Sequence, residues 1–143
     1  MKKIIIIISV IVICIVISIT YAYSMYKSDL NQVQKFNNEF SKYIDQEFYG
    51  NEVATIVNLA IDNNERYKIP KDSTGKYIED DSYSVRSDIY ITDSEKVYSM
   101  ELLNLGEISN FVNNYSNVKF KCTKVEYHKK TKRLSYLYIE QIS

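Results

Sequence analysis

The chain has 143 residues, and its 18 basic side chains balance its 18 acidic ones. Once the apolar N-terminal segment is set aside, the remainder is long enough for one domain with a single core and too short for two. The balanced charge excludes nucleic-acid binding driven by an overall positive field.

An apolar segment lies directly behind Lys2 and Lys3. Seventeen consecutive residues, Ile4 to Thr20, include no charge, no glycine and no proline. As a helix these residues reach about 25 Å, and residues 21–23 extend the span to about 30 Å, the thickness of the hydrocarbon core of a bilayer. We therefore expect residues 1–24 to form a single transmembrane anchor and residues 25–143 to form one domain.

The residues that flank this segment predict its orientation. Lysines precede it and a tyrosine cluster follows at 21–26, so the positive-inside rule places the N-terminus in the cytoplasm and the domain outside. Two alternatives stay open. A secretory signal peptide would be cleaved near Ala22 and release the domain, although this apolar stretch is longer than usual. A lipoprotein signal needs a small residue before its cysteine, whereas Cys14 follows Ile13.

Apolar residues recur at three- and four-residue steps over 28–48, which predicts an amphipathic helix. No proline or glycine separates it from the apolar segment, so we expect one continuous helix, ended by Gly50 as a C-cap. A second helix is expected over 52–64, capped by Asn51 and closed by Asp62, Asn63 and Asn64. Its expected buried face consists of Val53, Ile56, Val57, Ala60 and Ile61.

The period of the apolar residues changes from near 3.6 to 2 after a polar loop. This change predicts a short strand at 76–79 and a hairpin of two strands, 84–92 and 96–103, joined across Asp93 and Ser94. Helical spacing returns over 107–115, so a short helix is expected to interrupt the sheet.

Two further strands are expected near the C-terminus, at 118–127 and 134–142, joined by a turn at 128–133. The apolar phase shifts within the first of them, which predicts a β-bulge near Lys124. The chain therefore predicts an α+β fold with an antiparallel sheet of about four to five strands. Cys122 is expected to be a buried apolar side chain, because Cys14 in the bilayer cannot pair with it.

Three pieces of the domain are distinctive. They consist of Gly50, Ala54, Ile56, Asn58, Ala60 and Asn64; of Phe120, Cys122, Tyr127 and His128; and of Leu137 with Glu140. These pieces resemble a family of small single-pass membrane-anchored proteins of low-GC Gram-positive bacteria, which implies a class of envelope protein and brings no activity. The order of a membrane helix, an amphipathic helix and a sheet also resembles type IV pilins and pseudopilins. Pilins carry a Glu as the fifth residue after cleavage, whereas the first acidic residue here is Asp29.

Patterns typical of catalysis do not occur in the sequence. His128 is the single histidine and lies in a turn crowded with lysines, so we expect a solvated turn residue rather than a catalytic base. Three glycines cannot supply a Walker loop or a Rossmann fingerprint, and no zinc-ligand spacing exists. We expect no enzyme and no cofactor.

Two charged clusters are the remaining candidates for binding. Glu79, Asp80 and Asp81 offer oxygens to a hard cation such as calcium, but an ordinary polar loop fits them better because the EF-hand spacing is absent. The C-terminal hairpin is rich in lysine and could bind teichoic acid, anionic lipid or DNA, or could be the wetted face of an edge hairpin. The residues of this candidate anionic-ligand patch are Lys119, Lys121, Lys124, Lys129, Lys130, Lys132 and Arg133.

The sequence thus favours a non-enzymatic extracytoplasmic domain that binds another protein of the cell envelope. A pilin-like subunit and a binder of anionic polymers are the alternatives. The chain's 14 tyrosines suggest a half-buried sheet surface first and a partner-binding face second. A nucleic-acid partner is not expected, and the sequence predicts no particular small-molecule ligand.

Overall fold

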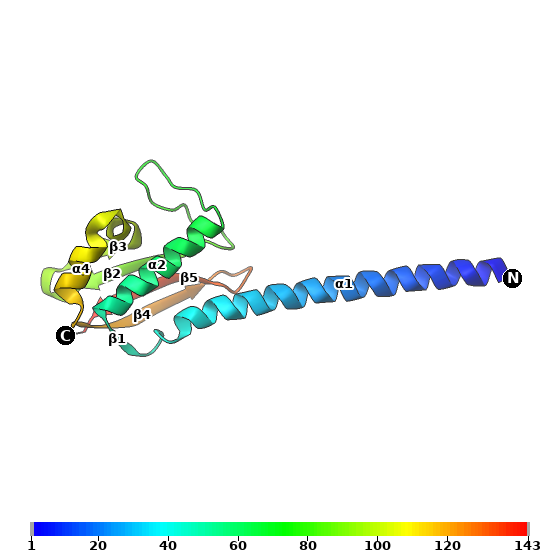
Figure 1. Cartoon of the computed structure of the whole chain (residues 1–143), viewed down its shortest axis with the longest axis horizontal. Helices are drawn as coiled ribbons and strands as arrows, with labels where there is room; N and C mark the ends of the chain where they lie inside the picture. Colours follow the sequence, from blue (N-terminus) through cyan, green and yellow to red (C-terminus); the bar gives the residue numbers. More distant parts are fainter. Residues whose placement is uncertain (1, 143) are drawn as a thin grey trace. The chain divides into compact units, whose positions relative to one another are not determined.

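The computed structural model describes residues 2–142, and the chain divides into two compact units, residues 1–35 and residues 36–143. The elements are labelled in Figure 1. Each unit is described by itself below.

Helix α1, Lys2–Ser41, supplies all of the first unit, and its last residues belong to the second. It runs without a break, as the absence of glycine and proline predicted. Within the described residues it is the one helix long and apolar enough to cross a membrane. Its large apolar side chains between Ile4 and Ile19 are each more than half exposed. The hydroxyl groups of Ser9 and Ser18 donate to carbonyls one turn earlier, so these polar groups are satisfied within the helix.

The predicted amphipathic helix ends seven residues early. Residues 42–44 form a turn, Asp45 has a φ of 60°, and strand β1 follows at Glu47–Tyr49. Phe48 pairs with Phe120 in the sheet, and both side chains are buried. Sheet pairing and aromatic burial therefore override the helical spacing at Phe48.

Helix α2, Gly50–Arg66, begins at the glycine that was expected to end the preceding helix. The Tyr49 amide donates to the Glu52 carboxylate, 3.1 Å away, which satisfies one of the free amides at the helix start and displaces Asn51 as the cap. A Cβ atom on Gly50 would lie 2.1 Å from the Tyr115 carbonyl oxygen, so close backbone packing requires glycine here. The five residues of the predicted buried face are all buried.

The five strands form one sheet in the order β1-β4-β5-β2-β3. The other strands are β2 Arg86–Ile91, β3 Lys96–Ser99, β4 Lys119–Tyr127 and β5 Leu134–Gln141. The α+β class, the β2–β3 hairpin and the β-bulge between Cys122 and Lys124 are confirmed. The sheet is mixed rather than wholly antiparallel, because the β4–β5 hairpin places β5 beside β2 and parallel to it.

Two predicted strands are wrong in whole or in part. Residues 76–79 form no strand, and only an isolated bridge joins Lys71 to Tyr77. The strand expected over 96–103 ends at Ser99, whose hydroxyl accepts from the Leu102 amide and so caps a short helix, α3. This helix, Met100–Leu102, continues through the kinked segment η2, Leu103–Glu107, into α4, Ile108–Tyr115; a 3₁₀ turn, η1 Thr92–Ser94, joins β2 to β3.

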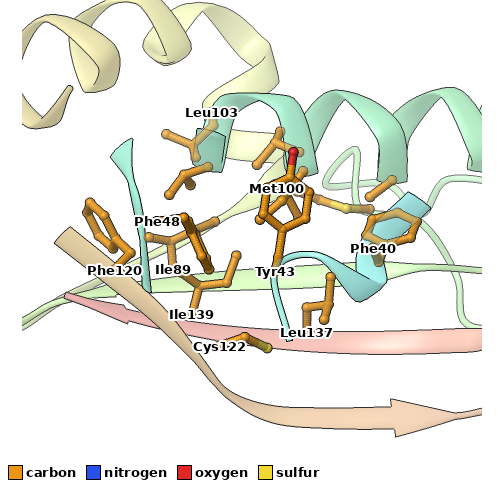
Figure 2. Packing of buried hydrophobic residues seen from close by; sticks show 14 of the residues in the cluster. Phe40, Tyr43, Phe48, Ile89, Met100, Leu103, Phe120, Cys122, Leu137 and Ile139 are labelled. Atoms are coloured by element: carbon orange, nitrogen blue, oxygen red, sulfur yellow. The ribbon is translucent and has the colours of Figure 1, made fainter. Parts of the chain in front are cut away.

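The core fills the space between the helices and one face of the sheet (Figure 2). Side chains from the end of α1, from α2, from the segment after β3 and from alternate positions of the strands meet there. Cys122 is buried among them, as predicted, and burial raises the pKa of its thiol. The residues labelled in Figure 2 are Phe40, Tyr43, Phe48, Ile89, Met100, Leu103, Phe120, Cys122, Leu137 and Ile139.

Candidate binding surface on the open face of the sheet

The second face of the sheet carries no helix within residues 36–142. Side chains on a strand alternate between the two faces, and the buried residues of β2, β4 and β5 all point toward the helices. Their neighbours form the opposite face, which we call the open face. Its residues are Arg86, Asp88, Tyr90, Lys121, Lys124, Glu126, Tyr136, Tyr138 and Glu140.

Tyr136 lies at the centre of a set of polar contacts on the open face. Its hydroxyl donates to a carboxylate oxygen of Asp88, 3.0 Å away, and the Arg86 guanidinium lies 4.5 Å from the centroid of its ring. Arg86 also pairs with Glu79 and, at 3.7 Å, with Asp88. Partial burial and the Asp88 carboxylate together raise the pKa of Tyr136 to about 12, so its hydroxyl stays protonated at neutral pH.

Charged side chains from β4 complete this surface on the other side of Tyr136. Lys124 pairs with Glu126 at 2.6 Å, and its ammonium lies 5.6 Å from the Tyr136 ring centroid. Tyr138, two residues further along β5, lies between Lys124 on β4 and Asp88 on β2 in the strand register. The open face thus presents half-buried aromatic rings among charges of both signs. Its tyrosines and its arginine are residue types enriched in protein interfaces, whereas its lysines and acidic residues are types depleted there.

A surface pocket of about 560 Å³ lies at one end of the open face. Its lining comes from the loop over residues 79–86 and from the hairpin turn that follows Tyr127, which we call its two walls, and also includes Tyr136. Asp80 organises the first wall, because one of its carboxylate oxygens accepts from the amides of Ser82, Tyr83 and Ser84. Partial burial alone would raise the pKa of Asp80, but these hydrogen bonds outweigh it and lower the pKa.

The acidic cluster considered for calcium does not converge on one point. The Glu79 carboxylate pairs with Arg86, while the Asp80 carboxylate holds backbone amides. Among residues 2–142 no group of three or more His, Cys, Asp or Glu side chains is arranged to hold a metal ion. The acidic residues therefore shape the loop.

The lysines of the candidate anionic-ligand patch fall into two groups. Lys119, Lys121 and Lys124 lie along β4, where Lys119 pairs with Glu47 at 2.9 Å and Lys124 pairs with Glu126. The exposed lysines of the hairpin turn, at positions 129, 130 and 132, form no salt bridge within the described residues. The positive charge of the patch is therefore less concentrated than the sequence suggests.

Two residues of the hairpin turn are buried, contrary to prediction. Arg133 is 3% exposed, so it presents no charge to an anionic ligand. His128 is 8% exposed, and its Nε2 lies 2.7 Å from the Ser84 carbonyl oxygen, so it joins the two walls of the pocket and is not a solvated turn residue. Lysine-rich surroundings predicted exposure. Residues distant in sequence cover these side chains: the loop at 80–85 contacts both, and Phe36, Asn63 and Tyr67 also contact Arg133.

No protein-family model, curated protein or solved structure matches this chain. On the open face, Arg86, Asp88 and Tyr136 contact one another and Lys124 pairs with Glu126, while the aromatic rings remain partly exposed.

Proposed function

We propose that this protein is a membrane-anchored, extracytoplasmic binding domain that recognises another envelope protein through the open face of its sheet. The observation that carries the proposal is the pairing of a membrane-length apolar helix with a sheet that is covered on one side only.

The anchor is supported by the exposure and composition of α1. Burial of its isoleucines and valines is worth about 25 cal/mol for each square ångström of apolar surface removed from water, so a bilayer is a strongly favoured environment for it. Lys2 and Lys3 at its start and the tyrosines at 21–26 favour a cytoplasmic N-terminus. The domain is then a component of the envelope on the outer side.

The binding face is supported by its composition. Tyr and Arg are enriched in protein interfaces. The Tyr ring buries a large area at a small cost in side-chain entropy, and the planar Arg guanidinium donates several hydrogen bonds and stacks on aromatic rings. Tyr90, Tyr136 and Tyr138 lie on adjacent strands, and Arg86 is already positioned against Tyr136. Prearranged side chains lose little freedom when a partner docks.

A photo-crosslinking amino acid at position 138 of the full-length protein tests this function in living cells. We expect one crosslinked protein that is also obtained from position 90, because both positions lie on the open face. The matched control is position 105, where Leu105 is 77% exposed but lies outside the sheet. Tyr90→Ser should weaken the crosslink from position 138 at least several-fold.

Two crosslinking results would contradict the proposed function. Equal crosslinking from positions 90, 105 and 138, or a crosslink at 138 that is unaffected by Tyr90→Ser, would show that the open face does not select a partner.

A second function, binding of anionic polymers, is favoured by the exposed lysines of the hairpin turn. Replacing Lys129, Lys130 and Lys132 with Gln should abolish retention on immobilised teichoic acid and flatten the dependence of retention on salt. Arg133 is left unchanged in this variant because it is buried. Retention equal to that of the unmodified protein rules this function out.

A further inference from the structure

Arg133 is a buried cation held by aromatic rings rather than by an acid. Its guanidinium lies 4.0 Å from the ring centroid of Phe36, 4.9 Å from that of Tyr67 and 5.5 Å from that of Tyr83. No salt bridge to it occurs within the described residues. Its Nη2 donates to the Asn63 side-chain oxygen at 2.8 Å, while its buried Nε has no partner.

The end of α1 is joined to the same turn by a second residue. The Asn37 side-chain amide donates to the Lys132 carbonyl at 2.9 Å, and its oxygen accepts from the Leu134 amide at 2.9 Å. Asn37 therefore continues the backbone pairing of the hairpin as though it were a peptide group. Together with the ring of Phe36 on Arg133, these bonds hold the last turns of α1 to the hairpin turn.

The loop that forms the first wall of the pocket is also joined to this turn. The Thr131 hydroxyl donates to the Ser82 carbonyl at 2.8 Å, and His128 contacts the Ser84 carbonyl. Hydrogen bonds from the end of α2 hold the same loop from the other side. Asn63 donates to the Tyr83 carbonyl, and the Asn64 side chain both donates to the Val85 carbonyl and accepts from the Val85 amide.

Four segments therefore meet at one place, and two of them are the walls of the pocket. We call this set the latch and define it as residues 36–37, 63–67, 80–84 and 128–133. Val85 and Leu134, which follow the loop and the turn, are buried in the core. Its contacts are mainly side-chain hydrogen bonds and cation–aromatic contacts, which each contribute about 1 kcal/mol, whereas the core holds the strands by apolar burial. The unpartnered Nε of Arg133 lowers the stability of the closed arrangement further.

We propose that the latch opens and closes as one unit, separately from the core, and thereby couples the last turns of α1 to the walls of the pocket. Asn37 contacts the hairpin turn, the turn contacts the loop at 80–85, and turn and loop enclose the pocket. A change at the end of α1 is thus transmitted to the pocket. This inference concerns the domain alone and does not depend on a partner at the open face.

Hydrogen exchange of the full-length protein in detergent micelles, followed by mass spectrometry, tests the latch. Arg133→Met removes the cation and leaves the buried Asn63 oxygen unpaired. We expect exchange to rise by about tenfold, equivalent to about 1.4 kcal/mol, over residues 36–39, 80–84 and 128–133 together. Exchange over 53–61 and 136–141 should stay unchanged. The matched control is Lys130→Met in the same turn, which should alter none of these segments because Lys130 is exposed.

Asn37→Ala is the decisive second variant, because Asn37 contacts the hairpin turn and makes no hydrogen bond to the loop at 80–85. If the latch is one unit, Asn37→Ala raises exchange in that loop as well. A rise confined to 36–39 and 128–133 overturns the proposal. So does a rise that includes 53–61 and 136–141, since the contacts would then belong to the cooperative unit of the whole domain. Asn37→Ala therefore still tests the proposal if Arg133→Met fails to fold.

Discussion

The two faces of the sheet differ completely although the same strands build both. On the covered face, Ile89, Leu137 and Ile139 are fully buried, while one residue away Asp88, Tyr136 and Tyr138 are partly exposed among charges. A step of one residue along a strand therefore separates a buried position from a partly exposed one. Substitutions on the covered face should change stability, and substitutions on the open face should change the proposed recognition.

Adjacent substitutions in β5 should separate the two faces with the largest effect. Leu137→Ala creates a cavity among buried side chains and should lower the free energy of unfolding by about 2–5 kcal/mol. Tyr138→Ala, on the open face, should lower it by about 1 kcal/mol or less. Urea unfolding of the full-length protein in micelles, followed by circular dichroism, measures both.

An equal loss of stability in Leu137→Ala and Tyr138→Ala would contradict the difference between the two faces of the sheet. It would mean that the open face is packed against other residues and is unable to receive a partner.

The packing of the helices over the covered face should be the next most sensitive feature. Gly50→Ala would place a methyl group against the Tyr115 carbonyl, which belongs to the backbone and cannot rotate away, so we expect a loss of about 1–3 kcal/mol. The control is Gly75→Ala, where a Cβ meets nothing within 4 Å but φ is +83°. Only backbone strain acts there, and the loss should be about 1–2 kcal/mol. If thermal unfolding shows a larger loss of stability for Gly75→Ala than for Gly50→Ala, the close approach of α2 to Tyr115 is not the reason for glycine at position 50.

The smallest expected effect is a dependence on pH at the pocket wall. Hydrogen bonds from three backbone amides lower the pKa of Asp80 in the folded state. The stability that they contribute is therefore present above the unfolded pKa of about 3.9 and is lost as pH falls through the lower, folded value. Asp80→Asn should reduce the decline in the urea midpoint between pH 6 and pH 3. An unchanged decline would show that Asp80 does not organise this loop.

The sequence predicts what repeats along the chain and misses what depends on distant contacts. The core residues of β2, β4 and β5 were predictable from the alternation of apolar residues, and those of α2 from helical spacing. Burial on one face produces these same patterns wherever a strand or helix packs on a core. The parallel pairing of β2 with β5 was not predicted, since alternation carries no information about direction.

The site was only partly predictable for the same reason. Tyrosines on a half-buried sheet surface were expected, and β5 and β2 supply them. Asn63 and Asn64 were read as the polar end of a helix, whereas α2 continues to Arg66 and both side chains are buried. They bind the backbone of the loop at 83–85, twenty residues away, and no local pattern shows a partner at that distance. Arg133 and His128 likewise contact residues distant in sequence, the loop at 80–85 among them.

The central claim is that α1 retains the domain on the outer side of a membrane. The most direct test is the accessibility of a single cysteine in intact cells. The variant combines Lys130→Cys with Cys14→Ala and Cys122→Ala, so that the exposed residue 130 carries the single thiol. We predict labelling by a membrane-impermeant maleimide without permeabilisation, on a full-length protein that resists extraction with alkaline carbonate. Labelling only after permeabilisation, or recovery of the domain in the soluble fraction, would contradict the account.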